Sequence, residues 1–367
     1  MLGSVRISAT QGFMLAIASI TVTGHLLFIP VIINQAGRDS WLSVLITIVP
    51  AVLIGFVVSS LAKLYPGRTI IEYTQEITGK WIGKLISCLF IFYFFHDTSL
   101  AIRGFGEFFT SAITPRTPIM VYFVAVTILA VYAVRNGLEV MARANQIFLV
   151  CMIPVGLTAS VLTQKDKVYK NFLPILEFGP QPALMGMFTL VSLYSTFVIL
   201  GMVFPFFAHQ EKIRKGSMIT MLILIVMFLG PITGPIAVFG LERSIGLSFP
   251  TFQLLRDIQV GDLQRLDLIG IVLWSLGSFA KISIFLFGTT VGLAQLFRLE
   301  DFRALAAPTG ALMVIVSLLN SENYIEMYRF FRDTFPYYSL FIGGFIPLVL
   351  FIIAIIRRLF EKRRENV

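Results

Sequence analysis

Long apolar runs dominate this sequence and constrain its fold more than any motif does. A helix needs about 20 consecutive apolar residues to cross a bilayer, and such runs recur along the 367-residue chain. Only 13% of the residues are charged and 57% are apolar, whereas about 25% of an ordinary soluble domain is charged. The pattern predicts an all-α polytopic membrane protein and disfavours a soluble enzyme.

Ten of these runs are long enough to be membrane-spanning helices. We place them at residues 11–33, 40–63, 81–111, 119–135, 139–163, 184–207, 216–240, 265–297, 304–321 and 335–356. They make residues 1–367 a single transmembrane domain, with repeats over about 11–163 and 184–356 and a basic cytoplasmic tail at 357–367. The segment 247–263 between the seventh and eighth spans suits a short surface helix, either a connector or a lid.

The distribution of basic residues predicts how the chain is oriented. With the N-terminus on the cytoplasmic side, most of the 29 Lys and Arg residues fall on that side, as the positive-inside rule requires. Both termini are therefore expected on the cytoplasmic side. The same rule accounts for the net charge of +9 without a nucleic-acid partner.

Polar and small residues interrupt the first and sixth spans near the bilayer centre. Interrupted helices at corresponding positions of two inverted repeats expose backbone groups and indicate a binding site at the midplane. The alternative is that these residues only allow close helix packing. The predicted ligand-binding residues of the two spans are Thr21, Val22, Thr23, Gly24, Ser195 and Thr196.

Two charged residues lie near the centres of spans. Asp97 is in the third span and Lys281 is in the eighth, and a charge at a helix centre costs about 2.5–3.5 kcal/mol. If these spans correspond in the two repeats, both side chains face one central region. There they would pair directly, hold the two ends of a zwitterionic ligand, or titrate during a conformational cycle. The alternative is a pair that only fixes helix register. We count both among the predicted ligand-binding residues.

Three further residues are candidates for coupling or gating, together with Asp97 and Lys281. Arg103 and Glu107 are four residues apart and so meet on one helical face, as a structural pair or as an outer gate. His25 lies at the interruption of the first span, where it would relay a proton or serve as a packing residue. No phosphate-binding glycine loop, metal-ligand cluster or catalytic triad has usable spacing. We therefore expect no cofactor, no metal and no enzymatic activity.

Several stretches share their order and spacing with one known family. The loop after the second span reads Pro66-Gly67-Arg68-Thr69-Ile70-Ile71-Glu72-Tyr73 and leads to Gly79-Lys80-Trp81-Ile82-Gly83-Lys84. The other stretches are Arg103-x3-Glu107, Gly137-Leu138-Glu139-x3-Arg143, Phe249-Pro250-Thr251, Arg265-Leu266-Asp267 with Trp274 and Lys281, and Gly292-Leu293-Ala294-Gln295. Together they resemble the endospore germination permeases, the integral-membrane B subunits of nutrient germinant receptors.

The resemblance carries expectations about fold, location and function. This family is related to the amino acid–polyamine–organocation transporters, which implies a LeuT-like five-plus-five inverted repeat with broken helices 1 and 6. It also implies residence in the inner spore membrane beside an A subunit and a lipoprotein C subunit. Apart from the resemblance, the basic residues between Arg357 and Arg364 predict contact with membrane lipid through anionic head groups. The function it favours is a germination receptor subunit that binds a small nutrient, with an amino acid favoured. A proton-coupled amino-acid transporter is the alternative, and an ion or water conduit is a third.

Overall fold

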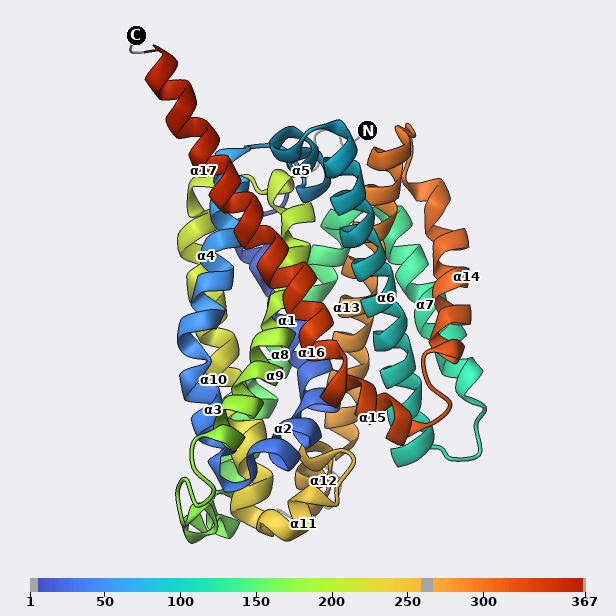
Figure 1. The fold of residues 1–367 in the computed structure, drawn as a ribbon. Helices are drawn as coiled ribbons and strands as arrows, with labels where there is room; N and C mark the ends of the chain where they lie inside the picture. Colours follow the sequence, from blue (N-terminus) through green and yellow to red (C-terminus); the bar gives the residue numbers. More distant parts are fainter. Residues whose placement is uncertain (1–5, 259–266, 366–367) are drawn as a thin grey trace.

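The computed structural model describes residues 6–258 and 267–365 and shows a helical bundle (Figure 1). The first half contains α1 (Ala9–Thr23), the π-helical turn η1 (Gly24–Phe28), α2 (Ile29–Ala36), η2 (Gly37–Asp39), α3 (Ser40–Ile46), α4 (Ile48–Leu64), α5 (Ile70–Thr78), α6 (Lys80–Ala112), α7 (Ile119–Asn136) and α8 (Leu138–Leu162). Two short 3₁₀ helices follow, η3 (Thr163–Asp166) and η4 (Tyr169–Phe172).

The second half is also helical and contains another π-helical turn. Its elements are α9 (Gln181–Ser195), the 3₁₀ helices η5 (Thr196–Met202), η6 (Phe204–Phe206) and η7 (Gln210–Lys212), α10 (Ile213–Phe239), α11 (Leu241–Ile245), α12 (Pro250–Asp257), α13 (Asp267–Phe297), α14 (Arg303–Leu319), α15 (Tyr324–Asp333), α16 (Phe335–Ser339), the π-helical turn η8 (Leu340–Phe345) and α17 (Ile346–Glu365). Within the described ranges the chain has no strand, and one isolated bridge joins Ile7 to Phe207.

Each of the ten predicted spans coincides with helix, so the predicted fold class is confirmed. By length and composition, eight helical segments of the described chain could each cross a membrane, or nine if α14 and α15, bent by 97°, form one span. The shorter apolar helix α4 corresponds to most of the second predicted span. Residues 259–263 of the predicted surface segment and 265–266 of the eighth span lie outside the described residues, as do the last two residues of the basic tail.

Burial differs sharply between helices of similar hydropathy. The most apolar window of the segment that begins with α1 is 94% buried, whereas that of the segment beginning with α8 is 11% buried. A helix that is apolar all round is buried in protein or faces lipid. The first segment is therefore the centre of the bundle, and α8 presents its apolar side chains to the membrane.

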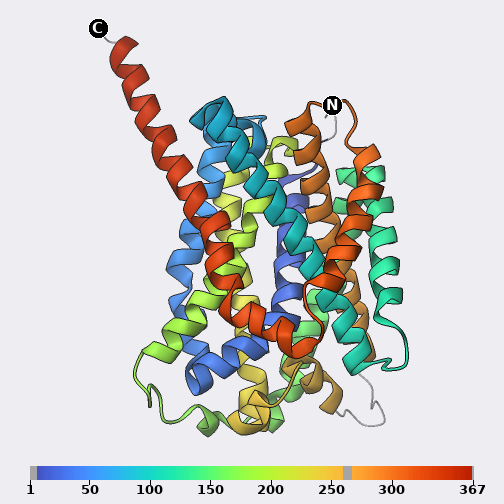
Figure 2. The same cartoon turned by 45° about the vertical axis from the view of Figure 1, so that its right-hand side comes forward.

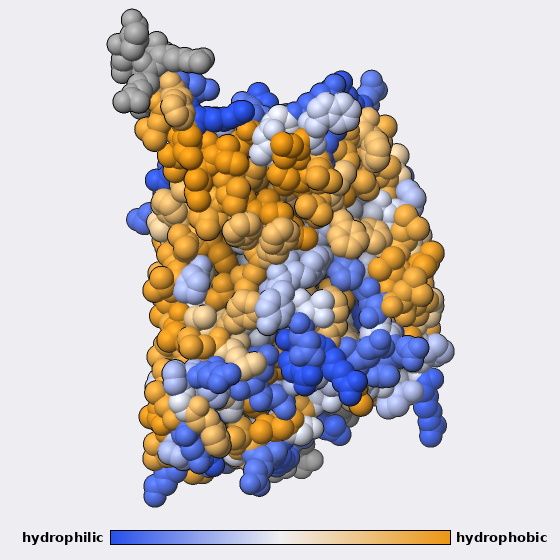
Figure 3. Space-filling view, viewed as in Figure 1, coloured by the Kyte–Doolittle hydropathy of each residue, from blue (hydrophilic) through white to orange (hydrophobic). Residues whose placement is uncertain are grey.

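The short helices gather at the two ends of the bundle. In Figures 1 and 2, α5 lies at the end that carries both chain termini, and α11 and α12 lie at the opposite end. We call these the α5 end and the α12 end. In Figure 3, apolar side chains cover most of the visible face between polar ends, as expected for a protein embedded in a bilayer.

A capping box fixes the start of α5. The Thr69 hydroxyl accepts a hydrogen bond from the Glu72 amide, and the Glu72 carboxylate accepts one from the Thr69 amide at 2.8 Å. This arrangement satisfies two backbone donors that a helix start would otherwise leave free. The amphipathic helix then buries Ile70, Ile71 and Tyr73 against the bundle.

Candidate functional site

The two charged residues predicted at mid-span lie in direct contact. Lys281 Nζ on α13 is 2.6 Å from Asp97 Oδ2 on α6, and neither side chain is more than 1% exposed. The ammonium group also lies 3.9 Å from the centroid of the Phe285 ring, a favourable cation–π position. Of the three arrangements predicted for this pair, the structure shows direct pairing. Removing one buried partner would leave the other charge uncompensated.

The first predicted interruption is a change of helix type. The backbone turns from α to π geometry at Gly24 and returns to α geometry at Ile29, without unwinding. A π-bulge is a rare single-turn feature, frequently found at functional sites. Pro30 stands in the first turn of the helix that follows, where its missing N–H is tolerated.

Two of the predicted ligand-binding residues are packing residues in this conformation. A Cβ at Gly24 would lie 2.1 Å from Phe228 Cζ, and a Cβ at Gly277 would lie 1.9 Å from Val22 Cγ2. Any side chain at Gly24 would therefore disrupt packing before it could report on ligand binding. The nearby hydroxyls differ: that of Thr23 donates to the Ser19 carbonyl at 3.3 Å, and that of Thr21 is buried and finds no hydrogen-bond partner among the described residues.

The second predicted interruption is again a change of helix type. The sixth span switches from α to 3₁₀ geometry at Thr196. The Thr196 hydroxyl donates to the Leu193 carbonyl at 2.6 Å, and the Ser195 hydroxyl donates to the Ser192 carbonyl at 2.7 Å. These side-chain bonds compete with the regular helical ladder and favour the local change.

A third interruption, missed from the sequence, lies in the last span and links α6 to the sixth span. The hydroxyl of Ser339, just before η8, bonds that of Ser195 at 2.8 Å and that of Tyr93 at 2.6 Å, and it also donates to the Ser192 carbonyl. Tyr93 precedes Asp97 by one turn of α6, so a hydrogen-bonded chain links the helix of the ion pair to the sixth span. The pair Gly343-Gly344 followed by Pro347 was the sequence signal for this interruption.

The remaining predicted residues lie apart from the Asp97–Lys281 contact. Arg103 and Glu107 form a buried ion pair with each other, with side chains 5% and 8% exposed. His25 packs edge-on against Phe228 at 5.0 Å between ring centroids, and its buried Nε2 has no hydrogen-bond partner within the described chain. The coupling or gating roles of these three residues stay predictions.

Aromatic side chains pack together at the α12 end of the bundle. Phe108 on α6 contacts Phe249, Phe252 on α12 and Trp274 on α13, with ring centroids 5.2–5.5 Å apart. The described part of the predicted surface segment is thus a short helix packed on the bundle. It covers the end of α6 that also carries Glu107.

At the α5 end, a polar groove brings together two of the stretches quoted above. It has a volume of about 610 Å³ and is lined by Arg68, Glu72, Gln75, Glu76, Lys80, Gln295 and Arg298. The Thr69 hydroxyl donates to Gln295 Oε1 at 2.7 Å. This bond ties α5 to the end of α13, the helix that carries Lys281.

Comparison with known proteins identifies the family. The family model described as spore germination protein matches residues 6–325. The chain belongs to this family. Among curated members, spore germination protein KB of Bacillus subtilis (strain 168) is 29% identical over 340 residues, covering 91% of this chain and 90% of that protein. Spore germination protein YndE of the same strain is 24% identical over 360 residues, covering 97% and 98%.

A solved structure confirms the architecture that the family resemblance implied. The chain superposes on MhsT in complex with L-phenylalanine with a TM-score of 0.72, covering 96% of this chain and 99% of that one at 12% identity. This germination protein family member is therefore an integral membrane protein with a LeuT-like fold. No group of three potential metal ligands occurs within residues 6–258 and 267–365.

Proposed function

We propose that this protein is the membrane-embedded subunit of a germinant receptor, which binds a small nutrient at the Asp97–Lys281 contact. We further propose that it lies in the inner spore membrane with both termini on the core side, beside an A subunit and a lipoprotein C subunit. The names of its relatives support a role in germination. The likeness to a transporter fold, solved in one case with an amino acid bound, supports a small-molecule ligand.

One observation carries the choice of ligand class: a pair of opposite charges, 2.6 Å apart, whose side chains are at most 1% exposed. A zwitterionic amino acid can replace this contact with two new ones, its carboxylate on Lys281 and its ammonium on Asp97. Each buried charge then keeps an opposite partner, so the desolvation cost of an isolated charge is avoided. A neutral sugar would break the pair without supplying charges of its own.

Signalling requires that the nutrient binds one conformation more tightly than another. Separating Asp97 from Lys281 moves α6 relative to α13, and α6 also carries Tyr93, which bonds Ser339 of the last span. Ser339 in turn bonds Ser195 at the change of helix type in the sixth span. We propose that ligand binding changes this hydrogen-bonded chain and that the partner subunits sense the movement.

The experiment compares the purified wild type with Asp97→Asn/Lys281→Met in binding assays with a panel of amino acids, sugars and nucleosides. The double variant removes both charges together, so no buried charge is stranded. A matched control, Glu139→Gln/Arg143→Met, removes the exposed ion pair of α8. We expect wild type and control to bind an amino acid and the double variant to lose binding. Wild-type affinity in the double variant would overturn the site.

A second assay separates the receptor from a transporter. We expect wild-type protein in proteoliposomes to bind its amino acid without sustained uptake driven by a pH gradient. Spores that lack the gene should lose their optical response to that nutrient while responding to others. Sustained uptake together with an unchanged germination response would favour the transporter alternative.

A further inference from the structure

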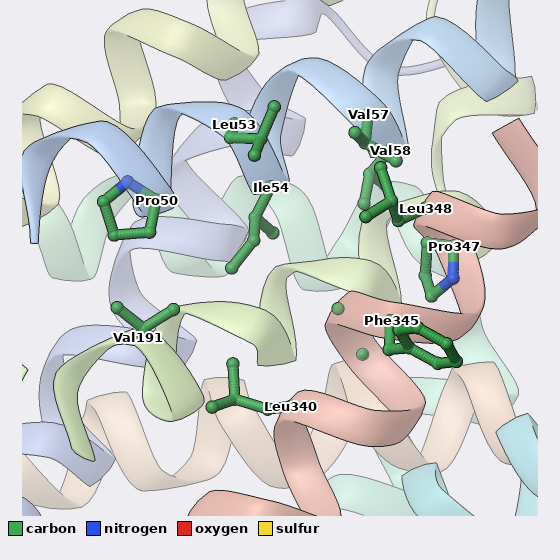
Figure 4. Close-up of a pocket in the computed structure, with 12 residues that line it drawn as sticks. Pro50, Leu53, Ile54, Val57, Val58, Val191, Leu340, Phe345, Pro347 and Leu348 are labelled. Atoms are coloured by element: carbon green, nitrogen blue, oxygen red, sulfur yellow. The ribbon is translucent and has the colours of Figure 1, made fainter. Parts of the chain in front are cut away.

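An apolar cleft opens on the side of the bundle between the second, sixth and last spans. Its volume is about 300 Å³, and it is lined by Pro50, Leu53, Ile54, Val57, Val58, Val191, Leu340, Gly343, Gly344, Phe345, Pro347 and Leu348 (Figure 4). Leu53 is 50% exposed and Phe345 is 55% exposed. In a protein embedded in a bilayer, these side chains face the hydrocarbon region.

The cleft adjoins the polar centre of the protein. Gly343 forms part of its lining, and a Cβ at this position would lie 2.5 Å from the Ser195 carbonyl oxygen. Leu340 and Phe345 are the first and last residues of the π-helical turn η8. Whatever fills the cleft therefore touches the irregular segment that packs on the sixth span.

Basic residues lie on α4 and α17 between the cleft and the α5 end of the bundle. Arg358 on α17 donates to the Leu64 carbonyl at the end of α4, at 2.9 Å, and Lys63, the residue before Leu64, is exposed. Leu348 of the cleft and Arg358 are ten residues apart on α17, which is about 15 Å along a helix. This distance is about half of the 30 Å hydrocarbon thickness of a bilayer, and thus the depth of one leaflet.

We propose that the cleft and these basic residues together form a binding site for one anionic phospholipid. Its phosphate lies at Lys63 and Arg358, and one acyl chain follows α4 and α17 into the cleft. The lining is apolar throughout, so a polypeptide strand there would leave its backbone groups without hydrogen-bond partners, whereas an acyl chain has no such groups. Lys63 and Arg358 lie about one leaflet's depth from the cleft, at the level of the lipid head groups. Their positive charges favour an anionic head group over a zwitterionic one. This site is separate from the proposed nutrient site, and its test needs no nutrient.

The test uses the full chain in nanodiscs that contain a trace of phosphatidylglycerol or phosphatidylcholine with a photoactivatable group on the acyl chain. Peptide mapping then locates the cross-links. We expect them to concentrate on the cleft-lining parts of α4 and α17, with roughly fivefold higher yield for phosphatidylglycerol. Uniform labelling of all lipid-facing helices, or equal yield for the two lipids, would show only annular lipid and overturn the proposal.

Two variant pairs sharpen the result. Leu53→Trp fills the cleft, and Val49→Trp places the same side chain one turn earlier on α4, at a residue that is 75% exposed and outside the lining. Arg358→Gln removes the phosphate contact, and Arg135→Gln removes an exposed arginine from the end of α7. Cleft labelling should fall in the first member of each pair and persist in the second. Equal labelling within both pairs would contradict the site.

Discussion

Gly343 of the last span packs directly on the backbone carbonyl of Ser195 in the sixth span. A Cβ added at Gly343 would lie 2.5 Å from that oxygen, closer than real side chains approach. The contact joins the π-helical turn η8 to the point where α9 gives way to 3₁₀ geometry. Two irregular segments from distant parts of the sequence therefore meet through a residue that has no side chain.

This contact predicts that Gly343→Ala destabilises the protein. The obstacle is backbone, which cannot rotate away, and overpacking of this kind typically costs about 1–3 kcal/mol. Gly344→Ala is the matched control, because its Cβ would meet nothing nearer than Leu340 Cδ2 at 3.8 Å. Thermal unfolding in detergent should show a lower midpoint for Gly343→Ala alone. Equal midpoints for the two variants would refute the close packing.

The Asp97–Lys281 pair predicts opposite results for single and double variants. Lys281→Met leaves the Asp97 carboxylate buried without its cation, at a cost of about 3–5 kcal/mol. Asp97→Asn/Lys281→Met removes both charges and should recover most of that stability. Unfolding midpoints and the yield of monodisperse protein provide the measurement. A double variant no more stable than Lys281→Met would show that the two side chains are not each other's partners.

The contact between Gly24 and Phe228 predicts a compensating pair. Gly24→Ala alone should be strongly destabilising, because its Cβ would lie 2.1 Å from the Phe228 ring. Phe228→Leu alone loses ring contacts with His25 and Tyr194. Combining the two should cost less than their sum, with a coupling energy of about 1 kcal/mol in a double-mutant cycle. Strict additivity would mean that the clash is relieved elsewhere.

Thr69 predicts a local effect at the α5 end. Thr69→Ala removes both the N-cap of α5 and the hydrogen bond to Gln295, and loss of such a cap costs about 1 kcal/mol. Thr69→Ser keeps a hydroxyl and should behave as the wild type. Hydrogen exchange of the amides in α5 should accelerate about fivefold in Thr69→Ala, while the middle of α13 stays protected. Unchanged exchange in α5 would argue against the cap.

Part of the candidate site could be predicted from the sequence because charge at the middle of an apolar run is visible without a structure. Asp97 and Lys281 were identified in this way. The packing of Val22 against Gly277 and of Gly24 against Phe228 could not be predicted, since the sequence of the first span is equally consistent with a ligand cradle and with close packing. Ser339 and Tyr93 were missed because a serine and a tyrosine in apolar spans carry no signal until their partners are known.

That the protein is helical and embedded in a membrane, where its helices run, and which charges lie within them could be predicted without a structure. These properties follow from local composition, because a chain in hydrocarbon must satisfy its own backbone hydrogen bonds and so forms a helix wherever apolar residues run long enough. The folded structure was needed to show that Lys281 contacts Asp97, that Gly343 packs on Ser195, and that a cleft is lined in part by Gly343. Such contacts depend on the rotation and depth of each helix relative to its neighbours, which side-chain packing between distant segments determines.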